Sequence, residues 1–509
     1  MTSAVQAPER FSPNLPDHIR HFIDGDAADS VDGRHFEAIE PATNQAYAAV
    51  AAGAAADVDR AVAAARRTHL EGAWSRLPAR ERARILVAIA EAIEARADLL
   101  AELESFDTGM PIAQARGQAA RAAENFRFFA DVIVTMSEEA FQTDSQLAYV
   151  LRRPVGVAGL ITPWNTPFML ETWKLAPALA AGCCVVLKPA EWTPLSAGLF
   201  PEIAREVGLP RGVLNVVHGI GEQAGAALAA HPDVPLISFT GETRTGQLIM
   251  AAAAPSLKGL SMELGGKSPC LVFADADVDD ALDSALFGVF SLNGERCTAG
   301  SRVLVERPLY DDFVEALADR AKRVRVGPPL DPATELGPLA HRDHLARVRA
   351  FIESGVTEGA RLVAGGGQPD GLGAGNYLEA TVLADVTSGM RVFQEEIFGP
   401  VVCVSPFADE DEAVRLANAT RYGLAAYVWT SDLRRGHRVA AEMDCGMVWL
   451  NSHNVRDLRT PFGGVKASGV GREGGRRSVE FYTEPRVVHV ALGATGVPRL
   501  GTNSQEDYR

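Results

Sequence analysis

The sequence predicts an α/β protein with two lobes and a small additional β element. From residue 155 onward, short apolar runs rich in β-branched residues alternate with stretches of helical period, which is typical of a parallel sheet with helical crossovers. A second series of the same kind follows Gly265. Two strand-like segments, 141–154 and 481–492, belong to neither series. A chain of 509 residues is too long for a single core, which agrees with more than one lobe.

Amphipathic helices are predicted near the start of the chain. Residues 57–70 and 78–106 have helical period, and the second segment has a proline near its first turn, a position that suits proline. Its Ile85, Ile89 and Ile93 recur at intervals of four and share one face. Both segments are therefore expected to be surface helices with an apolar face toward the core.

The first α/β series is expected to form a parallel sheet covered by helices on both faces. Its strands are predicted over residues 155–161, 184–188, 213–217 and 236–240, and its helices over residues 169–181, 194–208, 221–231 and 242–254. Sheets of this kind bind ligands beyond the carboxyl ends of their strands. A ligand site is therefore expected at that edge.

The second series predicts another α/β lobe. Its strands are expected over residues 268–274, 302–306, 401–407, 425–430 and 446–451, and its helices near 278–292 and 310–323. The segments 141–154 and 481–492 lie outside both lobes, and a chain-terminal strand needs a partner edge. A subunit interface is one candidate for that edge.

Composition and charge argue against several classes of protein. With 47% hydrophobic and 22% charged residues, the chain resembles ordinary globular proteins. Its net charge of −16 repels polyanions, so no nucleic-acid partner is expected. Glu171 and Lys174 interrupt the longest apolar run, which leaves no stretch of the roughly 18 residues that a membrane span needs. The first residues have no basic start followed by an apolar run, which predicts a cytoplasmic protein without a signal or transit peptide.

Cys297 differs from the other cysteines of the chain. It lies in the polar, glycine-containing segment NGERCTAGSR, a setting typical of a thiol that can meet a substrate. The six cysteines have no metal-type spacing, so no metal site is expected. The remaining ones are interpreted as small hydrophobic core residues: Cys183, Cys184, Cys270, Cys403 and Cys445.

Polar motifs follow several of the predicted strands. Asn165 stands in ITPWNTPF, Lys188 and Glu191 in KPAE, and Glu263 in MELGGKSP, while FTGETRTG contains two glycines. Each motif is weak alone, because an asparagine after a strand is more often a turn residue and a G-x-x-x-x-G more often a tight turn. A single glutamate is likewise more often solvated or paired. Their joint order along the chain is stronger evidence.

The motifs PWN, KPAE, FTGETRTG, ELGGKSP, GERC, EEIFGPV and PFGGVKASGVGREGG occur in this order. In this order they resemble the aldehyde dehydrogenase superfamily over about residues 20–495. The resemblance implies NAD-dependent oxidation of an aldehyde to a carboxylic acid. It also implies a fold with a Rossmann-type NAD-binding lobe, an α/β catalytic lobe and a small β oligomerisation element.

The same resemblance predicts the domain boundaries and the assembly. We expect a mobile N-terminal arm at 1–20, an NAD-binding domain at 21–135 and 155–261, a catalytic domain at 262–470, and an oligomerisation element at 136–154 and 480–495. A homodimer or homotetramer is implied.

The chemistry of aldehyde oxidation requires four functional groups. An aldehyde carbon must become tetrahedral before it releases hydride, and a thiolate achieves this by addition; the resulting thioester is then hydrolysed. The site therefore needs a thiol, an oxyanion donor, a carboxylate base and a dinucleotide cradle. The resemblance assigns Cys297 as nucleophile, Glu263 as base for hydrolysis, and Asn165 with the Cys297 backbone N–H as oxyanion hole. It assigns Glu473 as a carboxylate that relays protons.

The cofactor residues are also implied by the resemblance. Lys188 and Glu191 match residues that hold the adenosine ribose, and Glu396 and Phe398 match those that position the nicotinamide ribose. Because a carboxylate at Glu191 accepts a hydrogen bond from a free 2′-OH but repels a 2′-phosphate, NAD is favoured over NADP. Further cofactor contacts are expected at Ile161, Thr162, Pro163, Trp164, Gly221, Phe239, Gly241, Glu242, Gly246 and Leu264.

Two residues depart from the superfamily pattern. Glu242 replaces a small hydroxyl residue in the phosphate-facing turn, and Glu295 replaces the glutamine before the nucleophile. An anion at Glu242 would face a pyrophosphate. Either the side chain points away or cofactor binding is weaker.

The substrate mouth is predicted from the segment NSHNVRDLRTPFGG. It places Arg456 where many members carry an aromatic residue, with Arg459 three positions on, and Thr166 also replaces an aromatic residue. Arginine binds carboxylates through two hydrogen bonds, so an anionic semialdehyde is indicated. The alternative is that both arginines form salt bridges with Asp457 or another subunit. Trp173 and Phe462 are expected to complete the substrate site.

The segments around Cys297 and Arg456 resemble members of the superfamily that oxidise carboxylated semialdehydes. Enzymes for 2-hydroxymuconate semialdehyde, succinate semialdehyde and betaine aldehyde share the core motifs, and Arg456 argues most against the cationic betaine aldehyde. A CoA-acylating dehydrogenase has no need of the base Glu263. A non-catalytic scaffold is disfavoured because Asn165, Glu263 and Cys297 are all present.

Overall fold

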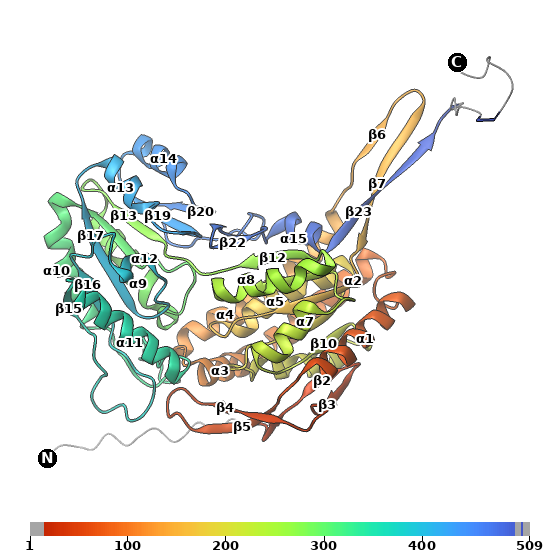
Figure 1. The fold of residues 1–509 in the computed structure, drawn as a ribbon, viewed down its shortest axis with the longest axis horizontal. Helices are drawn as coiled ribbons and strands as arrows, with labels where there is room; N and C mark the ends of the chain where they lie inside the picture. The colour runs from red at the N-terminus through yellow and green to blue at the C-terminus, as the bar shows by residue number, and fades with distance from the viewer. Residues whose placement is uncertain (1–14, 494–499, 502–509) are drawn as a thin grey trace.

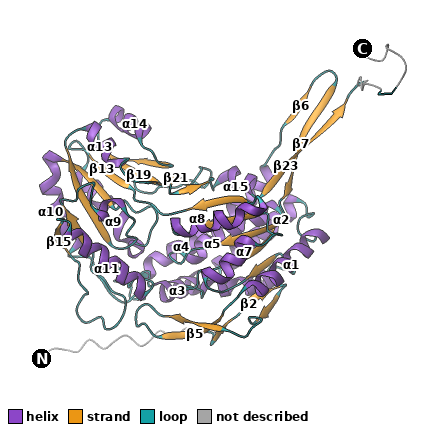
Figure 2. Ribbon diagram, viewed as in Figure 1, coloured by secondary structure: helices purple, strands orange, loops and turns teal. Residues whose placement is uncertain are grey.

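The computed structural model describes residues 15–493 and 500–501. Two α/β lobes lie beside each other, and a long β arm projects from one of them (Figure 1). The secondary structure shows that helices flank the sheet of each lobe (Figure 2). The predicted α/β class is therefore confirmed.

The first lobe is built on an eight-stranded sheet of order β22-β12-β11-β8-β9-β10-β2-β3. The strands β12, β11, β8, β9 and β10 are parallel, whereas β2, β3 and β22 join antiparallel at the two edges. Every residue of β8 and β9 is buried, because helices cover both faces. The strands are β2 (His21–Ile23), β3 (Asp26–Ala28), β8 (Val157–Ile161), β9 (Cys184–Lys188), β10 (Leu214–Val216), β11 (Leu236–Thr240), β12 (Gly259–Glu263) and β22 (Gly469–Val470).

The helices of this lobe mostly follow the sequence prediction. They are α1 (Ala55–Glu71), α2 (Ala79–Glu94), α3 (Ala97–Thr108), α4 (Ile112–Thr135), α5 (Pro167–Ala181), α6 (Phe200–Glu206), α7 (Ala226–Ala230), α8 (Thr243–Ala253) and α15 (Gly475–Phe481), with short turns of helix at Ser196–Leu199, Gly221–Gly225 and Ala254–Ser256. The single helix expected over 78–106 is two helices, since the backbone at Arg96 leaves the helical region (φ −112°, ψ 14°). Because of this break, α3 changes direction and packs on α4. No glycine or proline in the sequence marks the position of the break.

The second lobe contains a seven-stranded sheet of order β15-β16-β17-β14-β13-β19-β20, parallel except for β15. Its strands are β13 (Pro269–Val272), β14 (Arg302–Glu306), β15 (Arg361–Ala364), β16 (Thr381–Ala384), β17 (Val401–Phe407), β19 (Ala425–Trp429) and β20 (Met447–Leu450), and the small pair β18 (Tyr422–Gly423) and β21 (Val465–Lys466) lies apart. Its helices are α9 (Val278–Phe290), α10 (Tyr310–Ala321), α11 (Arg342–Thr357), α12 (Arg391–Gln394), α13 (Glu410–Ala417) and α14 (Leu433–Glu442), with short helical turns at Ser291–Gly294 and Arg307–Leu309.

The projecting arm is formed by segments far apart in sequence (Figure 1). The strand β23 (Thr483–Ala491) pairs antiparallel with β7 (Gln146–Pro154), which also pairs with β6 (Ala140–Gln142). The partner edge that the terminal strand requires is thus supplied within the chain. The arm exposes large apolar side chains, among them Phe141, Leu151 and Val487.

The first residues of the described chain are part of the fold. β1 (His18–Ile19) pairs with β5 (Ala46–Ala51), which pairs with β4 (His35–Ile39). The N-terminal arm expected over 1–20 therefore does not extend through His18, because two of these residues hydrogen-bond to the edge of a sheet. Residues 1–14 lie outside the described residues.

The carboxyl ends of four neighbouring parallel strands meet at one edge of the first sheet. β12, β11, β8 and β9 end there at Glu263, Thr240, Ile161 and Lys188. The polar motifs predicted to follow these strands are consequently brought together facing the second lobe. Among the helices that the structure describes, none is both long and apolar enough to cross a membrane.

Candidate active site

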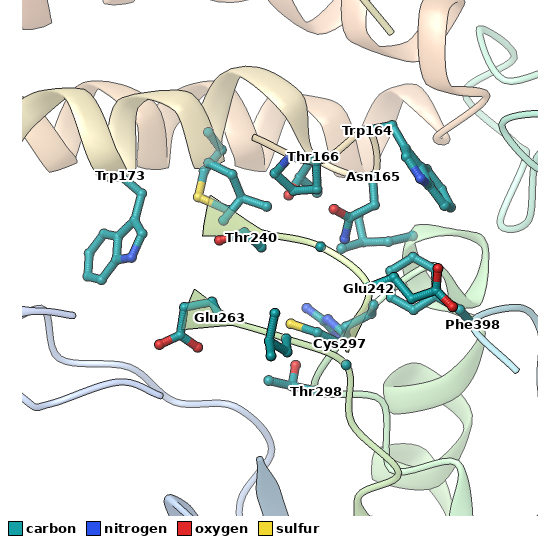
Figure 3. Close-up of a pocket in the computed structure, with 18 of the residues that line it drawn as sticks. Trp164, Asn165, Thr166, Trp173, Thr240, Glu242, Glu263, Cys297, Thr298 and Phe398 are labelled. Carbon is teal, nitrogen blue, oxygen red and sulfur yellow. The ribbon is translucent and has the colours of Figure 1, made fainter. Parts of the chain in front are cut away.

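A cavity of about 430 Å³ lies between the lobes, at the carboxyl edge of the first sheet. Figure 3 shows Cys297 with Asn165 on one side and Thr298 on the other, and Glu263 across the space. The sequence-predicted residues that line this cavity are Pro163, Trp164, Asn165, Thr166, Trp173, Gly241, Glu242, Glu263, Leu264, Cys297, Glu396, Phe398, Arg456, Phe462 and Glu473. The predicted residues outside its lining are Ile161, Thr162, Lys188, Glu191, Gly221, Phe239, Gly246 and Arg459.

Cys297 lies on a loop that follows the helical turn Ser291–Gly294. Leu292 and Asn293 in this turn have positive φ angles of 53° and 57°, so the chain reverses sharply before the cysteine. The thiol is half-buried, and burial raises its pKa to about 12. The positive charges of Arg296 and Arg456 act in the opposite direction. They favour the thiolate, which is the nucleophilic form.

Asn165 is positioned by the end of β8 and the start of α5. Its side-chain Nδ2 donates a hydrogen bond of 2.8 Å to the backbone carbonyl of Glu295, two residues before Cys297. An amide nitrogen has two N–H groups, so this bond fixes the amide and leaves one donor for a ligand. Such a fixed donor beside a nucleophile can stabilise an oxyanion.

Glu263 ends β12 and is only 5% exposed. Neither carboxyl oxygen has a hydrogen-bond partner within the described part of the chain. Burial, and next the charge of Glu473, raise its pKa well above the ordinary value of a glutamate. A buried carboxyl without partners is costly and is typical of functional sites rather than structural ones. The Glu263 carboxyl group is therefore suited to take up a proton during a reaction.

Glu473 is held differently from Glu263. Its Oε1 accepts hydrogen bonds from Lys174 Nζ (2.8 Å), Ser238 Oγ (2.9 Å) and Ser261 Oγ (3.2 Å), and its Oε2 accepts one from Trp173 Nε1 (2.5 Å). Lys174 also forms a buried ion pair with it. Both oxygens of the Glu473 carboxyl group therefore have hydrogen-bond partners, in contrast to those of Glu263.

The two arginines of the predicted substrate mouth lie in different surroundings. The Arg456 guanidinium lies between two aromatic rings, 4.7 Å from the centre of Trp173 and 4.1 Å from that of Phe462. It forms no ion pair among the described residues, and burial lowers its pKa to about 10. Arg459 is 80% exposed and pairs with Asp457 (Nη2 to Oδ2, 2.5 Å). The expected salt bridge with Asp457 is thus formed by Arg459, whereas Arg456 faces the cavity.

Further residues of the cavity lining were not predicted from the sequence: Gln118, Arg121, Met169, Leu170, Trp192, Thr240, Gly265, Leu292, Arg296, Thr298, Asp343, His344, Arg347 and Asn454. Gln118 and Arg121 come from α4, and Arg296 directly precedes Cys297. A sequence signal existed for Arg296, Thr298, Thr240 and Gly265, because these residues stand inside the motifs around Cys297, Gly241 and Glu263. The α4 residues reach the cavity through packing of the helix against α5, which sequence spacing does not reveal.

The residues beyond β9 and β11 form a cradle that fits a dinucleotide. Lys188 Nζ lies 2.7 Å from Glu191 Oε2 at the end of β9. Burial would raise the pKa of Glu191, but Lys188 and the backbone hydrogen bonds of Glu191 and Gly221 together outweigh burial, so the pKa is lowered and the charged carboxylate is favoured. The N-terminus of α8 begins at Thr243 beside this edge, and helix N-termini attract phosphate groups. A Cβ at Gly246 would lie 2.6 Å from Leu264 Cδ2, so a larger residue there would displace the Leu264 side chain.

Unpartnered polar groups support the same fit. The hydroxyl oxygens of Thr162 and Thr240 are buried at the ends of β8 and β11 and have no partner among the described residues. A bound polar ligand would satisfy them.

The family model of the aldehyde dehydrogenase family matches residues 28–488. The chain belongs to this family. It is 49% identical to the 5-carboxymethyl-2-hydroxymuconate semialdehyde dehydrogenase of Escherichia coli, over 90% of this chain and 97% of that protein.

Solved structures agree with this assignment. The crystal structure of HpcC from Thermus thermophilus has a TM-score of 0.93 and 52% identity, with 96% of each chain covered. The NAD+ complex of an aldehyde dehydrogenase from Bacillus cereus has a TM-score of 0.91 and 40% identity, covering 94% of this chain and 97% of that one. The protein is thus an aldehyde dehydrogenase that uses NAD, as the sequence predicted.

Glu295, which departs from the family pattern, is buried in this aldehyde dehydrogenase. Its Oε1 accepts a hydrogen bond from Ala340 N (2.9 Å), and His344 Nε2 lies 3.7 Å away. Burial raises its pKa well above the usual range, which favours the neutral carboxyl, the form that resembles the glutamine it replaces.

Glu242, the second departure, lies at the N-terminus of α8. It is exposed, lines the cavity near Phe398 (Figure 3), and its side chain does not cap the helix. The helix N–H groups therefore remain available to a phosphate.

Proposed function

We propose that this aldehyde dehydrogenase oxidises a semialdehyde that carries a distal carboxylate, such as 5-carboxymethyl-2-hydroxymuconate semialdehyde. The observation that carries this proposal is the Arg456 guanidinium, which lies in the cavity without an ion-pair partner among the described residues. A buried cation without a counterion is costly, and a substrate carboxylate would offset that cost. The Escherichia coli relative named above acts on a semialdehyde of this kind.

The positions of the side chains support the following catalytic roles. The Cys297 thiolate attacks the aldehyde carbon, and the developing oxyanion accepts hydrogen bonds from Asn165 Nδ2 and the Cys297 backbone N–H. NAD, when bound, supplies the carbon that accepts the hydride. The loss of hydride leaves an acyl group joined to Cys297 as a thioester.

Hydrolysis of the thioester requires a base. Glu263 lies across the cavity from Cys297 (Figure 3) and takes a proton from the attacking water. The carbon–sulfur bond then breaks, which releases the carboxylic acid and restores the thiol. The Lys174–Glu473 pair behind Glu263 carries the proton away.

The cofactor and assembly proposals rest on other elements. Lys188 and Glu191 hold the adenosine ribose, while Glu396 and Phe398 position the nicotinamide ribose. We infer a homodimer or homotetramer in which the arm of β6, β7 and β23 covers its exposed apolar side chains against another subunit. All six cysteines are free, which suits a reducing compartment, and we infer a cytoplasmic location.

A panel of aldehydes with and without a distal carboxylate, assayed with NAD and NADP by NADH or NADPH absorbance, tests the proposed function. We expect the highest kcat/KM for a carboxylated semialdehyde with NAD. A preference for neutral aldehydes or for betaine aldehyde would contradict the proposed substrate class.

A further inference from the structure

Four arginine side chains without carboxylate partners among the described residues line one cavity. Arg347 from α11 donates a hydrogen bond to the Glu396 backbone carbonyl. The others are Arg121 from α4, Arg296 from the cysteine loop, and Arg456. None forms an ion pair with a carboxylate of residues 15–493 or 500–501. Surface arginines, in contrast, do form ion pairs with carboxylates, for example Arg320 with Asp283 and Arg459 with Asp457. Carboxyl side chains line the same cavity, but none of them forms an ion pair with these arginines among the described residues: Glu242, Glu263, Asp343, Glu396 and Glu473.

The charges of Arg121, Arg296 and Arg456 are close enough to affect one another. Burial, and next the charge of Arg296, lower the pKa of Arg121. Burial, and next the charge of Arg121, lower the pKa of Arg456 to about 10. Like charges in a buried site destabilise one another. Glu263 and Glu473 favour the charged form of Arg456, and each carboxylate on a ligand would offset a further part of the positive charge.

Arg296 is held independently of Arg456. Its Nη1 donates a hydrogen bond of 3.0 Å to Ser291 Oγ, and its guanidinium lies 5.6 Å from the ring centre of Phe287, on α9 of the second lobe. Arg456 stacks instead on Trp173, from α5 of the first lobe. A guanidinium has five N–H donors, so the bond to Ser291 leaves donors free for a carboxylate. The cavity thus has two separately anchored guanidinium groups.

We propose that Arg296 forms a second carboxylate subsite, beside the one at Arg456 and Arg121, and that the enzyme thereby selects semialdehydes with two carboxylates. This inference rests on the proposed function, because the same aldehyde must reach Cys297. Two compounds that differ in one carboxylate can distinguish binding at the second subsite from binding at the first. 5-Carboxymethyl-2-hydroxymuconate semialdehyde differs from 2-hydroxymuconate semialdehyde by one carboxymethyl group, which adds the second negative charge.

The test measures kcat/KM of wild type and Arg296→Gln for both compounds. We expect Arg296→Gln to lower kcat/KM by about 10–100-fold for the dianionic substrate, as for the loss of one charged two-bond contact. For the monoanionic substrate kcat/KM should fall by less than about threefold. Arg456→Gln should lower kcat/KM for both substrates. Arg320→Gln, which removes one positive charge from the surface, is the matched control and should change neither.

Several outcomes would overturn the inference. Equal losses of kcat/KM for both semialdehydes would mean that Arg296 activates the Cys297 thiol or holds its loop in place. The rate of Cys297 alkylation by iodoacetamide would then fall as well. Equal kcat/KM of the wild type for both compounds would also overturn it. A wild type that prefers hexanal to either semialdehyde would instead refute the proposed function. If the glutamine variant does not fold, Arg296→Lys replaces it, and selective loss with the dianion is again expected because lysine lacks the planar fork.

Discussion

The side-chain amide of Asn165 donates a 2.8 Å hydrogen bond to the backbone carbonyl of Glu295. This contact connects the loop after β8 in the first lobe to the cysteine loop in the second. It fixes the amide before a substrate arrives, and a donor that needs no reorganisation stabilises an oxyanion more effectively.

Asn165→Ala should therefore lower kcat by about 10²–10³-fold, the usual effect of removing one oxyanion donor. Steady-state NADH formation measures this loss, and NAD binding, followed by protein fluorescence, should be unchanged. An unaltered kcat would mean that Asn165 only shapes the turn before α5.

Cys297→Ala should abolish aldehyde oxidation and leave NAD binding nearly intact, because the thiol forms the covalent intermediate and is no part of the cofactor cradle. The matched control is Cys445→Ala, which removes another half-buried thiol outside the cavity. This control should keep full activity. Substantial NADH production by Cys297→Ala would refute the covalent mechanism.

Glu263→Gln should permit a stoichiometric burst of NADH and slow turnover by about 10²–10⁴-fold, because the base acts after hydride transfer. The raised pKa of Glu263 keeps its carboxyl protonated, and unable to accept a proton, to higher pH than usual. Wild-type hydrolysis should therefore accelerate as pH rises, and the variant should lose this dependence. Rapid-mixing and steady-state kinetics measure both phases. An equal loss of burst and turnover would place Glu263 in an earlier step.

Arg456→Ala should raise KM for an anionic semialdehyde by about 10–100-fold, equivalent to roughly 1.5–3 kcal/mol, and should scarcely affect neutral aldehydes. Lysine at this position should restore only part of the loss. Arg459→Ala is the matched control, since its exposed ion pair with Asp457 lies outside the cavity lining. Equal KM changes for anionic and neutral aldehydes would remove the structural reason for a carboxylated substrate.

Glu104 provides a test of pH-dependent stability. Burial raises the pKa of its carboxyl to about 7 from the ordinary 4.5. The folded protein therefore keeps this proton to higher pH than the unfolded chain, so the stability it contributes is complete below about pH 4.5 and is lost as pH rises through about 7. Glu104→Gln cannot ionise and retains an oxygen for Phe168 N and Ser196 Oγ, which Glu104 now binds.

We expect Glu104→Gln to raise the free energy of unfolding by about 1–3 kcal/mol at pH 8 and by much less at pH 5. Urea denaturation at both pH values measures this difference. The control is Glu102→Gln, a partly exposed glutamate on the same helix α3, which should show no such difference. An equal effect of Glu104→Gln at both pH values would contradict the expectation.

Much of the fold follows from local sequence patterns. The strands at 184–188, 236–240, 302–306 and 401–407 begin and end where predicted, because each is a short run of mainly apolar residues buried on both faces. The placement of Asn165, Lys188 and Glu263 at strand ends also follows, since parallel strands present their carboxyl ends at one edge.

Other features depend on contacts between distant segments. The ion pair of Lys174 with Glu473 joins residues 299 positions apart, and Arg121 reaches the cavity because α4 packs on α5. Neither relationship leaves a local pattern in the sequence.

The sequence by itself determined the α/β class, the family and the candidate catalytic residues, because strand periodicity and ordered motifs are local properties. Only the tertiary structure separated Arg456 from Arg459, which stand three positions apart in one loop. The path of that loop places Arg456 between Trp173 and Phe462 in the cavity, while Arg459 turns to Asp457 at the surface. Side-chain direction in an irregular loop depends on the surfaces packed around it, and no periodicity in the sequence encodes them.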